Sequence, residues 1–298
     1  MSILVDKDTT IIVQGITGRE AASFTKDSLD YGAKIIGGVT PGKGGSDVFG
    51  LPVTDTVREL TEQFKVDASI ISVPPAFVRD AAYEAVENGI KLLLVVTERV
   101  PHRDVVDMIA LCKLRGATLV GPNSLGVISP GKSRLGMVGG PAKDVSKSYT
   151  PGPIGVISRS GGMTTEMANL LSVGGLGQST CVSVGGDPIV GMQFADLVPL
   201  FEADPETKAI VLFTEPGGGQ ESALAEHLRK SPPKLPIFCF IAGRFVDDMR
   251  GMHFGHASTL VQSDADTTTA KARVLEEAGV VVVEDLSSLA ARVRDATA

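Results

Sequence analysis

The chain has 298 residues, of which 43% are hydrophobic and 21% are charged, and its formal net charge is -7 at pH 7. The negative charge excludes a general binder of nucleic acids or of membrane surfaces, because either needs a basic face. A chain of this length exceeds the usual size of one domain, so we expect two α/β domains around separate cores.

No apolar run reaches the roughly 18 residues that span a bilayer, and the first residues lack a charged leader followed by a hydrophobic segment. We therefore expect a cytoplasmic protein, or one of the mitochondrial matrix if a transit peptide has been removed. Cys112, Cys181 and Cys239 lie far apart in or beside apolar runs and show no CxxC spacing. This pattern predicts buried cysteines without disulfides.

The first half of the chain alternates short apolar runs with longer mixed segments, which is typical of strands joined by crossover helices in a parallel sheet. Ligands bind at the carboxyl ends of the strands in such sheets, so the loops after the strands hold the candidate binding residues. The predicted strands lie near Thr10–Gln14, Lys34–Val39, Ala68–Val73, Lys91–Val96 and Thr118–Val120.

Residues 139–153 have the composition of a linker and no periodic apolar face. We place the domain boundary there, between residues 1–145 and residues 146–298. The second domain is predicted to hold another parallel sheet, of flavodoxin-like type, with a helix near Met163–Leu171. Its strands are expected near Ile154–Ser158, Ser179–Val184, Ala209–Thr214, Ile237–Ala242 and Val280–Glu284.

The segment Gln14–Ala21 follows a strand and opens a helix. Its glycines let backbone N–H groups approach a phosphate, whose charge a helix N-terminus favours. The pattern is not a full GxGxxG, and the second strand ends at Gly37–Thr40 without the acidic residue that nicotinamide enzymes use for a ribose. The loop Pro41–Gly45 then presents Lys43, which suits a nucleotide phosphate. A tight turn with a solvated lysine is the alternative reading.

Three further strand ends face the same edge of the sheet, at residues 72–75, 96–98 and 121–124. Each loop alone is explained by ordinary turn chemistry. Together with the first two loops, they indicate a long, extended ligand such as coenzyme A. The contacts proposed from these three loops are Val73, Pro74, Val96, Thr97, Glu98 and Asn123.

The second domain opens with Ser158–Glu166, sequence SRSGGMTTE, again a strand, a tight loop and a helix start. Free N–H groups at that helix start can receive an anion, although the spacing does not distinguish a bound phosphate from an ordinary cap. The GxSxG spacing of serine hydrolases is absent around Ser160.

The four histidines differ in their surroundings. His102 reads as a solvated loop residue, and His227 as a solvated residue on a polar helix. The segment Gly251–Ser258, by contrast, holds His253 and His256 among glycines in a loop.

A histidine in such a loop is often structural, whereas a phosphorylated one needs a carboxylate that orients the ring and raises its basicity. Glu215, which follows the predicted strand Ala209–Thr214, is the best candidate for that carboxylate. The chain has no GxxxxGK[ST] loop, so a partner chain is expected to supply the nucleotide if His256 is phosphorylated. It also lacks HExxH and His/Cys clusters, so we expect no metal site.

The order of these motifs resembles that of the α-subunit family of succinyl-CoA synthetase over nearly the whole chain. The shared motifs are MSILVDK at 1–7, GITG at 15–18, GGVTPGKGG at 37–45, GPN at 121–123, SRSG at 158–161, GGDP at 185–188 and GHA at 255–257. The resemblance implies a Rossmann-like CoA-binding domain followed by a flavodoxin-like ligase domain.

The resemblance also implies roles for individual residues. His256 would carry the phosphoryl group with the help of Glu215, and the helix start at Ser160, Gly161 and Gly162 would hold that group. The contacts to coenzyme A would include Thr17, Gly18, Arg19, Glu20, Lys43, Val96, Thr97 and Glu98.

In that family a β subunit with an ATP-grasp domain, in a heterodimer or heterotetramer, binds ATP or GTP with Mg²⁺ and phosphorylates the histidine. The phosphoryl group then passes to a small carboxylic acid, and coenzyme A displaces phosphate from the acyl phosphate. Succinate, the acid of the tricarboxylic acid cycle enzyme, is the first expectation.

Several departures from the succinate pattern leave the acid open. Residues 160–166 read SGGMTTE where the succinate enzymes have SGTLTYE, so Thr165 takes the place of a tyrosine near the acid. The strings SRSGGM and MHFGHA look more like ATP citrate lyase and citryl-CoA synthetase. Citrate, malate or another di- or tricarboxylate is therefore the alternative substrate. A nicotinamide-dependent dehydrogenase and a non-catalytic CoA-binding regulator are the alternatives from other classes.

Overall fold

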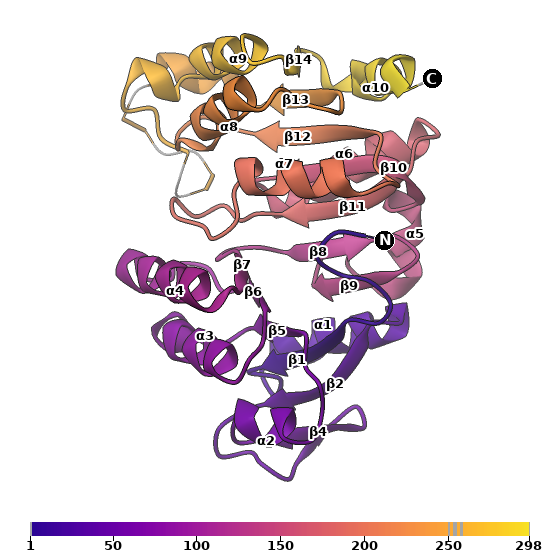
Figure 1. Ribbon diagram of the computed structural model, residues 1–298, viewed down its shortest axis with the longest axis vertical. Helices are drawn as coiled ribbons and strands as arrows, with labels where there is room; N and C mark the ends of the chain where they lie inside the picture. The colour runs from indigo at the N-terminus through magenta and orange to yellow at the C-terminus, as the bar shows by residue number, and fades with distance from the viewer. Residues whose placement is uncertain (1, 250, 253–254, 257–258, 298) are drawn as a thin grey trace.

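The structure, a computed structural model, describes residues 2–249, 251–252, 255–256 and 259–297. In this part of the chain, two seven-stranded sheets lie one after the other along the long axis of the molecule, with helices on their faces (Figure 1). The fold is α/β, with a Rossmann-like first half and a flavodoxin-like second half, as the sequence predicts.

The first sheet has the strand order β3-β4-β2-β1-β5-β6-β7. Its central strands are buried along their whole length, because helices cover both faces of the sheet. The elements are β1 (Thr10–Gln14), α1 (Arg19–Tyr31), β2 (Lys34–Val39), β3 (Asp47–Val48), β4 (Leu51–Thr54), α2 (Val57–Thr61), β5 (Ala68–Ile71), a 3₁₀ turn (Pro75–Phe77), α3 (Val78–Glu87), β6 (Leu92–Val95), α4 (His102–Arg115) and β7 (Thr118–Val120).

The second sheet has the strand order β14-β13-β12-β10-β11-β8-β9. The elements are β8 (Gly126–Ser129), β9 (Ser133–Gly136), α5 (Ala142–Ser148), β10 (Pro151–Ser158), α6 (Gly161–Val173), β11 (Gln178–Ser183), α7 (Phe194–Ala203), β12 (Ala209–Thr214), α8 (Gln220–Lys230), β13 (Ile237–Ile241), α9 (Thr268–Glu276), β14 (Val281–Val283) and α10 (Leu289–Thr297). Three further 3₁₀ turns cover Arg244–Asp248, Asp264–Asp266 and Leu286–Ser288.

Neither sheet is entirely parallel, which corrects the expectation of two parallel sheets. In the first sheet β3 runs antiparallel to its neighbour β4 at the edge. In the second sheet the hairpin β8–β9 is antiparallel, and β8 pairs antiparallel with β11. The hairpins β3–β4 and β8–β9 lie at sheet edges, and the crossover pattern of the remaining strands does not predict them.

The segment predicted as a linker, residues 139–153, is largely regular structure. It contains α5 and the start of β10. Within α5 only Val145 is buried, so the helix has no periodic apolar face, and it packs against the side of α6. The hairpin of residues 126–136 already belongs to the second sheet. The chain therefore passes between the sheets before residue 145, and the division at that residue stays a proposal.

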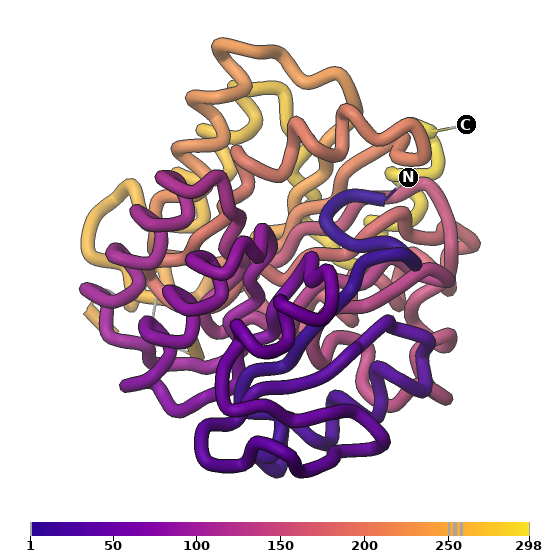
Figure 2. The backbone as a smooth tube through the Cα atoms, turned by 60° about the horizontal axis from the view of Figure 1, so that its bottom comes forward, coloured from indigo at the N-terminus to yellow at the C-terminus, as the bar shows by residue number. Residues whose placement is uncertain are grey.

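One continuous apolar cluster joins the two halves, whereas the buried members of two further clusters lie in one half each, so the expectation of separate cores is confirmed only in part. The cluster includes Ile11 and Val13 of the first sheet and Val182 of the second, and Val127 and Leu135 of the hairpin also belong to it. The N-terminal segment reinforces this junction, since it runs beside the second half (Figure 2). Ser129 Oγ donates to the carbonyl of Val5 at 3.2 Å. All three cysteines are free and buried, as predicted.

The strand orders place the candidate loops in each half. In an open parallel sheet, ligands bind where the strand order reverses, outside the carboxyl ends of the strands. In the first sheet this point lies between β1 and β5, whose loops begin at Gly15 and Ser72. In the second sheet it lies between β10 and β12, whose loops begin at Arg159 and Glu215.

Candidate active site

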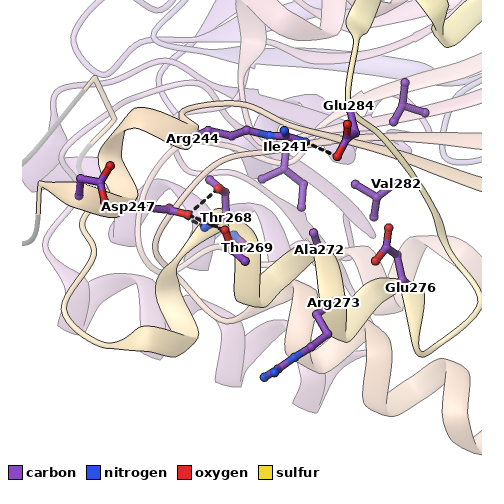
Figure 3. A pocket seen from close by; sticks show the side chains of 12 residues that line it. Ile241, Arg244, Asp247, Thr268, Thr269, Ala272, Arg273, Glu276, Val282 and Glu284 are labelled. Carbon is purple, nitrogen blue, oxygen red and sulfur yellow. Dashed lines mark hydrogen bonds and ion pairs between the residues drawn. The ribbon is translucent and has the colours of Figure 1, made fainter.

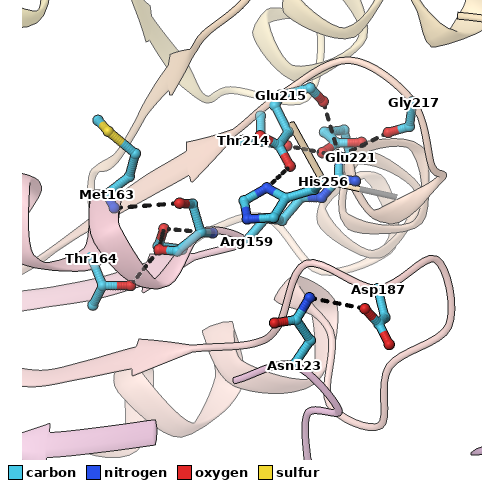
Figure 4. Close-up of polar contacts among 12 residues, drawn as sticks. Asn123, Arg159, Met163, Thr164, Asp187, Thr214, Glu215, Gly217, Glu221 and His256 are labelled. Atoms are coloured by element: carbon cyan, nitrogen blue, oxygen red, sulfur yellow. Dashed lines mark hydrogen bonds and ion pairs between the residues drawn. The ribbon is translucent and has the colours of Figure 1, made fainter. Parts of the chain in front are cut away.

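The loop after β12 brings Glu215 onto the imidazole of His256. His256 Nδ1 lies 2.7 Å from Glu215 Oε1, although the two residues are separated by 41 positions (Figure 4). An ionised carboxylate only accepts hydrogen bonds, so Nδ1 carries a proton, and in the neutral ring Nε2 keeps its lone pair. The ring is thereby held with a nucleophilic nitrogen on the side away from Glu215.

The pKa shifts of the pair agree with this contact. The hydrogen bond to Glu215 raises the pKa of His256 above its ordinary value, although burial and the positive charge of Arg159 oppose the shift. Burial alone raises the pKa of Glu215, but the hydrogen bond from His256 and the charges of His256 and Arg159 outweigh it, and the net shift is downward. Glu215 therefore stays ionised and His256 is a stronger base than a free imidazole.

A glycine loop packs against the other side of the imidazole. A Cβ added to Gly186 would lie 2.5 Å from His256 Cδ2 and 3.0 Å from Nε2, so only glycine fits the ring in this position. The neighbouring Asp187 is buried, and its Oδ1 accepts a hydrogen bond from Asn123 Nδ2 at 2.9 Å (Figure 4). Asp187 also contributes to the raised pKa of His256 through its charge.

The start of α6 lies next to the Glu215 loop, because β10 pairs with β12 and the backbone N–H of Arg159 donates to Phe213 at 3.2 Å. The Ser160 side chain accepts from the Met163 backbone N–H at 3.4 Å and so caps the helix. No neighbouring atom lies within 4 Å of a Cβ built on Gly162.

Two neighbouring residues are directed elsewhere. The Thr165 hydroxyl is hydrogen-bonded to that of Tyr149 at 2.9 Å. A Cβ on Gly161 would overlap Leu125 at 2.2 Å. Of the predicted phosphate loop, Gly162 is the residue that faces open space most directly.

Two adjoining cavities, of about 690 and 540 Å³, lie at the switch point of the first sheet. They share Gly18 and the residues Ser72–Pro74. The predicted contacts Gly18, Arg19, Glu20, Val73, Pro74, Val96, Thr97, Glu98 and Asn123 line the larger cavity. Thr17 lines the smaller one, and Lys43 lines neither.

The cavities suit a long ligand that carries phosphates. Gly18 caps α1 without a side chain, so the first N–H groups of the helix are open, and Arg19 adds a cation beside them. Gly15 lets the backbone approach Ser72, whose carbonyl would lie 2.2 Å from an added Cβ. The smaller cavity has apolar walls from Val39, Val73 and Phe77 among others. Coenzyme A, with an adenine, phosphates and a long chain, fits this combination.

The larger cavity is connected to the His256 loop through Asn123. Its side chain holds Asp187, and its carbonyl accepts from the backbone N–H of Gly186 at 3.3 Å. One residue therefore lines the cavity and braces the glycine against which the imidazole packs.

A third cavity, of about 490 Å³, lies at the carboxyl ends of β13 and β14 (Figure 3). Asp247 in its wall accepts from the Thr268 backbone N–H at 2.7 Å and so caps α9. Arg244 pairs with Glu284 at 3.4 Å. We assign no ligand to this cavity, because these charges are engaged with one another and with the helix end.

The structure describes two further histidines, His102 and His227. His102 is the first residue of α4, so its assignment to a loop is wrong; the preceding Pro101 supplies the backbone angle that a helix start needs. His227 lies on α8, as predicted. His253, Ala257 and Ser258, which were also singled out, lie outside the described residues.

Comparison with known proteins identifies the family of both halves of the chain. Residues 6–99 match the family described as CoA binding domain, and residues 151–294 match the family described as succinyl-CoA ligase like flavodoxin domain. Succinate–CoA ligase [ADP-forming] subunit alpha 1 of Archaeoglobus fulgidus is 43% identical over 296 residues, which cover 99% of this chain and 98% of that protein. The chain belongs to the α-subunit family of ADP-forming acid–CoA ligases.

Within this family the named acid varies. The malate–CoA ligase subunit alpha of Methylorubrum extorquens is 39% identical over 302 residues, which cover 100% of this chain and 99% of that protein. A structure of ATP citrate lyase from Methanothrix soehngenii with citrate and coenzyme A superimposes with a TM-score of 0.91 at 24% identity. It covers 99% of this chain and 50% of the lyase chain, and at this identity the likeness concerns the fold.

Two negative findings concern the described residues only. They include no helix that is both long and apolar enough to cross a bilayer. They also include no group of three or more His, Cys, Asp and Glu side chains suited to a metal ion.

Three buried side chains that support the Glu215 loop were not predicted from the sequence. Arg159, Glu221 and Lys271 are each at most 2% exposed and meet under this loop. Arg159 belongs to the SRSGG string, and Lys271 appears as an ordinary charge on a helix. Only an apolar pattern interrupted by a charge at a core position of α9 hinted at the burial of Lys271.

Proposed function

We propose that the chain is the α-type subunit of a nucleoside-diphosphate-forming acid–CoA ligase in which His256 carries a phosphoryl group between the nucleotide and the acid. The contact of Nδ1 with Glu215, which leaves Nε2 as the nucleophile, carries this proposal. The α designation of the relatives supports a β-type partner, to which we assign an ATP-grasp domain that holds ATP or GTP with Mg²⁺.

In the first step Nε2 attacks the terminal phosphorus of the nucleotide. The N–P bond forms as the P–O bond to the diphosphate breaks, and Glu215 stabilises the positive charge that the ring acquires. The backbone N–H groups of Gly161 and Gly162, at the start of α6, receive the phosphoryl oxygens, because that of Ser160 already donates to Ser158 Oγ at 3.1 Å. Positioning and electrostatic stabilisation supply most of the rate in such transfers.

In the second step an oxygen of the carboxylic acid attacks the phosphorus and His256 leaves as neutral imidazole, which gives an acyl phosphate. The sulfur of coenzyme A then attacks the carbonyl carbon. The C–O bond to phosphate breaks, and the thiol proton leaves with the phosphate or with solvent. We place coenzyme A in the two adjoining cavities, with its thiol end toward Asn123 and the His256 loop.

Succinate is the first candidate for the acid, because two relatives that are 43% and 40% identical carry that name. Malate and citrate remain the second candidates. Thr165 replaces the tyrosine of the succinate pattern, and its hydroxyl is bound to Tyr149, which changes the polar groups offered to the acid. A non-catalytic CoA-binding regulator has no use for the Glu215–His256 pair.

The test is CoA-dependent formation of nucleoside diphosphate by the chain co-expressed with its β-type neighbour, with succinate, malate, citrate and itaconate supplied in turn. Strong turnover with succinate makes Thr165 a neutral variation, whereas turnover with malate or citrate alone assigns a change of specificity. The absence of turnover with every acid, together with an unphosphorylated His256, would refute the proposal.

Arg19 and Lys43 test the placement of coenzyme A. Arg19→Met and Lys43→Met are each expected to raise the Kd for coenzyme A about tenfold, since a charge-assisted hydrogen bond to phosphate contributes about 1.5 kcal/mol or more. Isothermal titration calorimetry at low and high salt measures the Kd for coenzyme A. The control is Lys26→Met, which removes a cation of α1 paired with Asp30. An unchanged Kd for Lys43→Met would remove Lys43 from the site.

Gly186→Ala tests the packing of the imidazole. The new Cβ would overlap His256, and the ring is the freer of the two, so His256 is expected to move off Glu215. Phosphorylation of His256, followed with γ-labelled ATP in the presence of the partner, is expected to fall about 100-fold, a loss typical of misplaced reacting groups. The Kd for coenzyme A and the melting temperature should stay near those of the wild type. Normal labelling of the variant would show that the ring tolerates displacement.

A further inference from the structure

Lys271 is a buried cation that the proposed reaction does not use. It lies on α9 with 2% of its surface exposed, and burial lowers the pKa of its ammonium group. Its three N–H donors are all engaged. Nζ donates to the carbonyl of Glu215 at 3.0 Å, to the carbonyl of Gly217, and to Glu221 Oε2 at 2.7 Å. Two of its three hydrogen bonds thus hold the backbone of the loop of residues 215–217.

Arg159, in the loop after β10, donates to the same two carbonyl oxygens. Its Nη1 donates to Glu215 O at 2.9 Å and to Gly217 O at 2.8 Å, and lies 3.7 Å from Glu221 Oε1. The hydroxyl of Thr214 also donates to Glu221 (Figure 4). Three elements, the loop after β10 and the helices α8 and α9, therefore converge beneath residues 215–217.

The loop needs such support because its sequence does not hold it in place. Gly217 and Gly218 have φ of 77° and 71°, in the left-handed region, and glycine backbones have many accessible conformations. Without donors on both carbonyls, the Glu215 backbone can rotate and carry the carboxylate away from His256. The carboxylate itself is restrained by its 2.7 Å hydrogen bond to Nδ1 of His256, which lies in a loop too.

The charges are arranged for this task. Arg159 and Lys271 carry two positive charges and Glu221 one negative charge, so the buried set keeps one positive charge next to the Glu215 backbone. Buried ion pairs contribute little to stability, because the loss of hydration offsets the attraction. Apolar side chains in place of the Glu221–Lys271 pair would hold α8 and α9 together equally well. They would supply no hydrogen-bond donor to the carbonyls of Glu215 and Gly217.

We propose that Lys271 is a positioning residue, whose ammonium group fixes the carbonyls of Glu215 and Gly217 and so keeps the Glu215 carboxylate on Nδ1 of His256. This rests on the proposed function only in its kinetic consequence. The geometric part, a fixed Glu215–His256 contact, is measurable without any substrate.

The experiment compares two variants of the full chain. Lys271→Met keeps the length of the side chain but leaves Glu221 buried without its cation, which can prevent folding. Lys271→Met combined with Glu221→Gln removes both charges together and keeps the volume. Arg273→Met is the matched control, since it removes an exposed cation from the same helix.

The first readout is the pKa of His256, followed by NMR on histidine-labelled chain. Glu215, Arg159 and Asp187 are the charged groups that act on this ring. The double variant is expected to lower the pKa of His256, as Glu215→Gln does, while Arg273→Met leaves it unchanged. If Lys271 had only a structural role, the double variant would have a lower melting temperature but the same pKa of His256 as the wild type.

The second readout is the rate of His256 phosphorylation with the partner and ATP, expected to fall at least tenfold in the double variant. A folded double variant with the wild-type pKa and rate would overturn the inference. If the wild type itself is not phosphorylated, the proposed ligase function fails, while the pKa comparison still decides the role of Lys271.

Discussion

His256→Asn is expected to abolish phosphoryl transfer, with a fall in acid–CoA ligase turnover of about 10⁴-fold or more, the scale seen when a covalent nucleophile is removed. The amide of asparagine can still donate a hydrogen bond to Glu215 in place of Nδ1, so the loop keeps its partner. No nucleophilic nitrogen remains in the place of Nε2. Turnover by the co-expressed pair, and acid-labile label from γ-labelled ATP, measure the loss.

The controls separate chemistry from binding. The Kd for coenzyme A should stay near the wild-type value, because His256 does not line either cavity. His227→Asn changes a histidine of α8 and should leave both label and turnover unchanged. Residual label on the His256→Asn chain at the wild-type level would place the phosphoryl group on another residue and remove His256 from the mechanism.

Glu215→Gln is expected to slow phosphorylation of His256 by about 10² to 10⁴-fold, the range found when the carboxylate behind a catalytic imidazole becomes an amide. A glutamine amide can either accept from Nδ1 or donate to it. In the second case the proton moves to Nε2, which is then no longer a nucleophile. The variant also loses the negative charge that stabilises the positively charged ring.

Glu215→Gln is also expected to move the pH dependence of His256 phosphorylation to lower pH. In the wild type the hydrogen bond to Glu215 raises the pKa of His256, and the nucleophile is the form without a proton on Nε2, so the rate rises with pH through that raised pKa. Glu215→Gln removes the cause of the shift. The rise in rate therefore moves to lower pH although the maximum rate falls.

Single-turnover labelling of His256 between pH 5 and 9 measures both effects in one series. Glu226→Gln is the matched control, since it changes an exposed carboxylate of α8 that pairs with Lys230. A profile of Glu215→Gln that moves to higher pH, or does not move, would contradict the assignment of Glu215 as the partner of His256.

Much of the fold was predictable because the central strands are short apolar runs separated by helices. The predicted Thr10–Gln14, Lys34–Val39 and Ala209–Thr214 agree with β1, β2 and β12 at both ends. The edge hairpin β8–β9 and the helix α5 were not predictable. Their residues carry few apolar side chains of their own, and they are ordered by packing against α1, α6 and β11.

The candidate site divides in the same way. Glu215 and His256 were paired from the sequence alone, because a phosphorylated histidine needs a carboxylate partner and the family resemblance pointed to these two positions. Their 2.7 Å contact agrees with that pairing. The sequence also indicated which strand-end loops line the cavities of the first sheet. The individual roles of these residues stay proposals, and Lys43, which lines neither cavity, is the one that the geometry supports least.

The sequence by itself determined the fold class and the family, and it predicted the candidate loops, since these depend on local patterns and on motifs in a fixed order. Only the tertiary structure decided what supports the site. Asn123 reaches Asp187 across 64 positions, and Lys271 reaches Glu215 across 56. Such contacts depend on how sheets and helices pack, and the residue type alone does not show whether a lysine is buried or solvated.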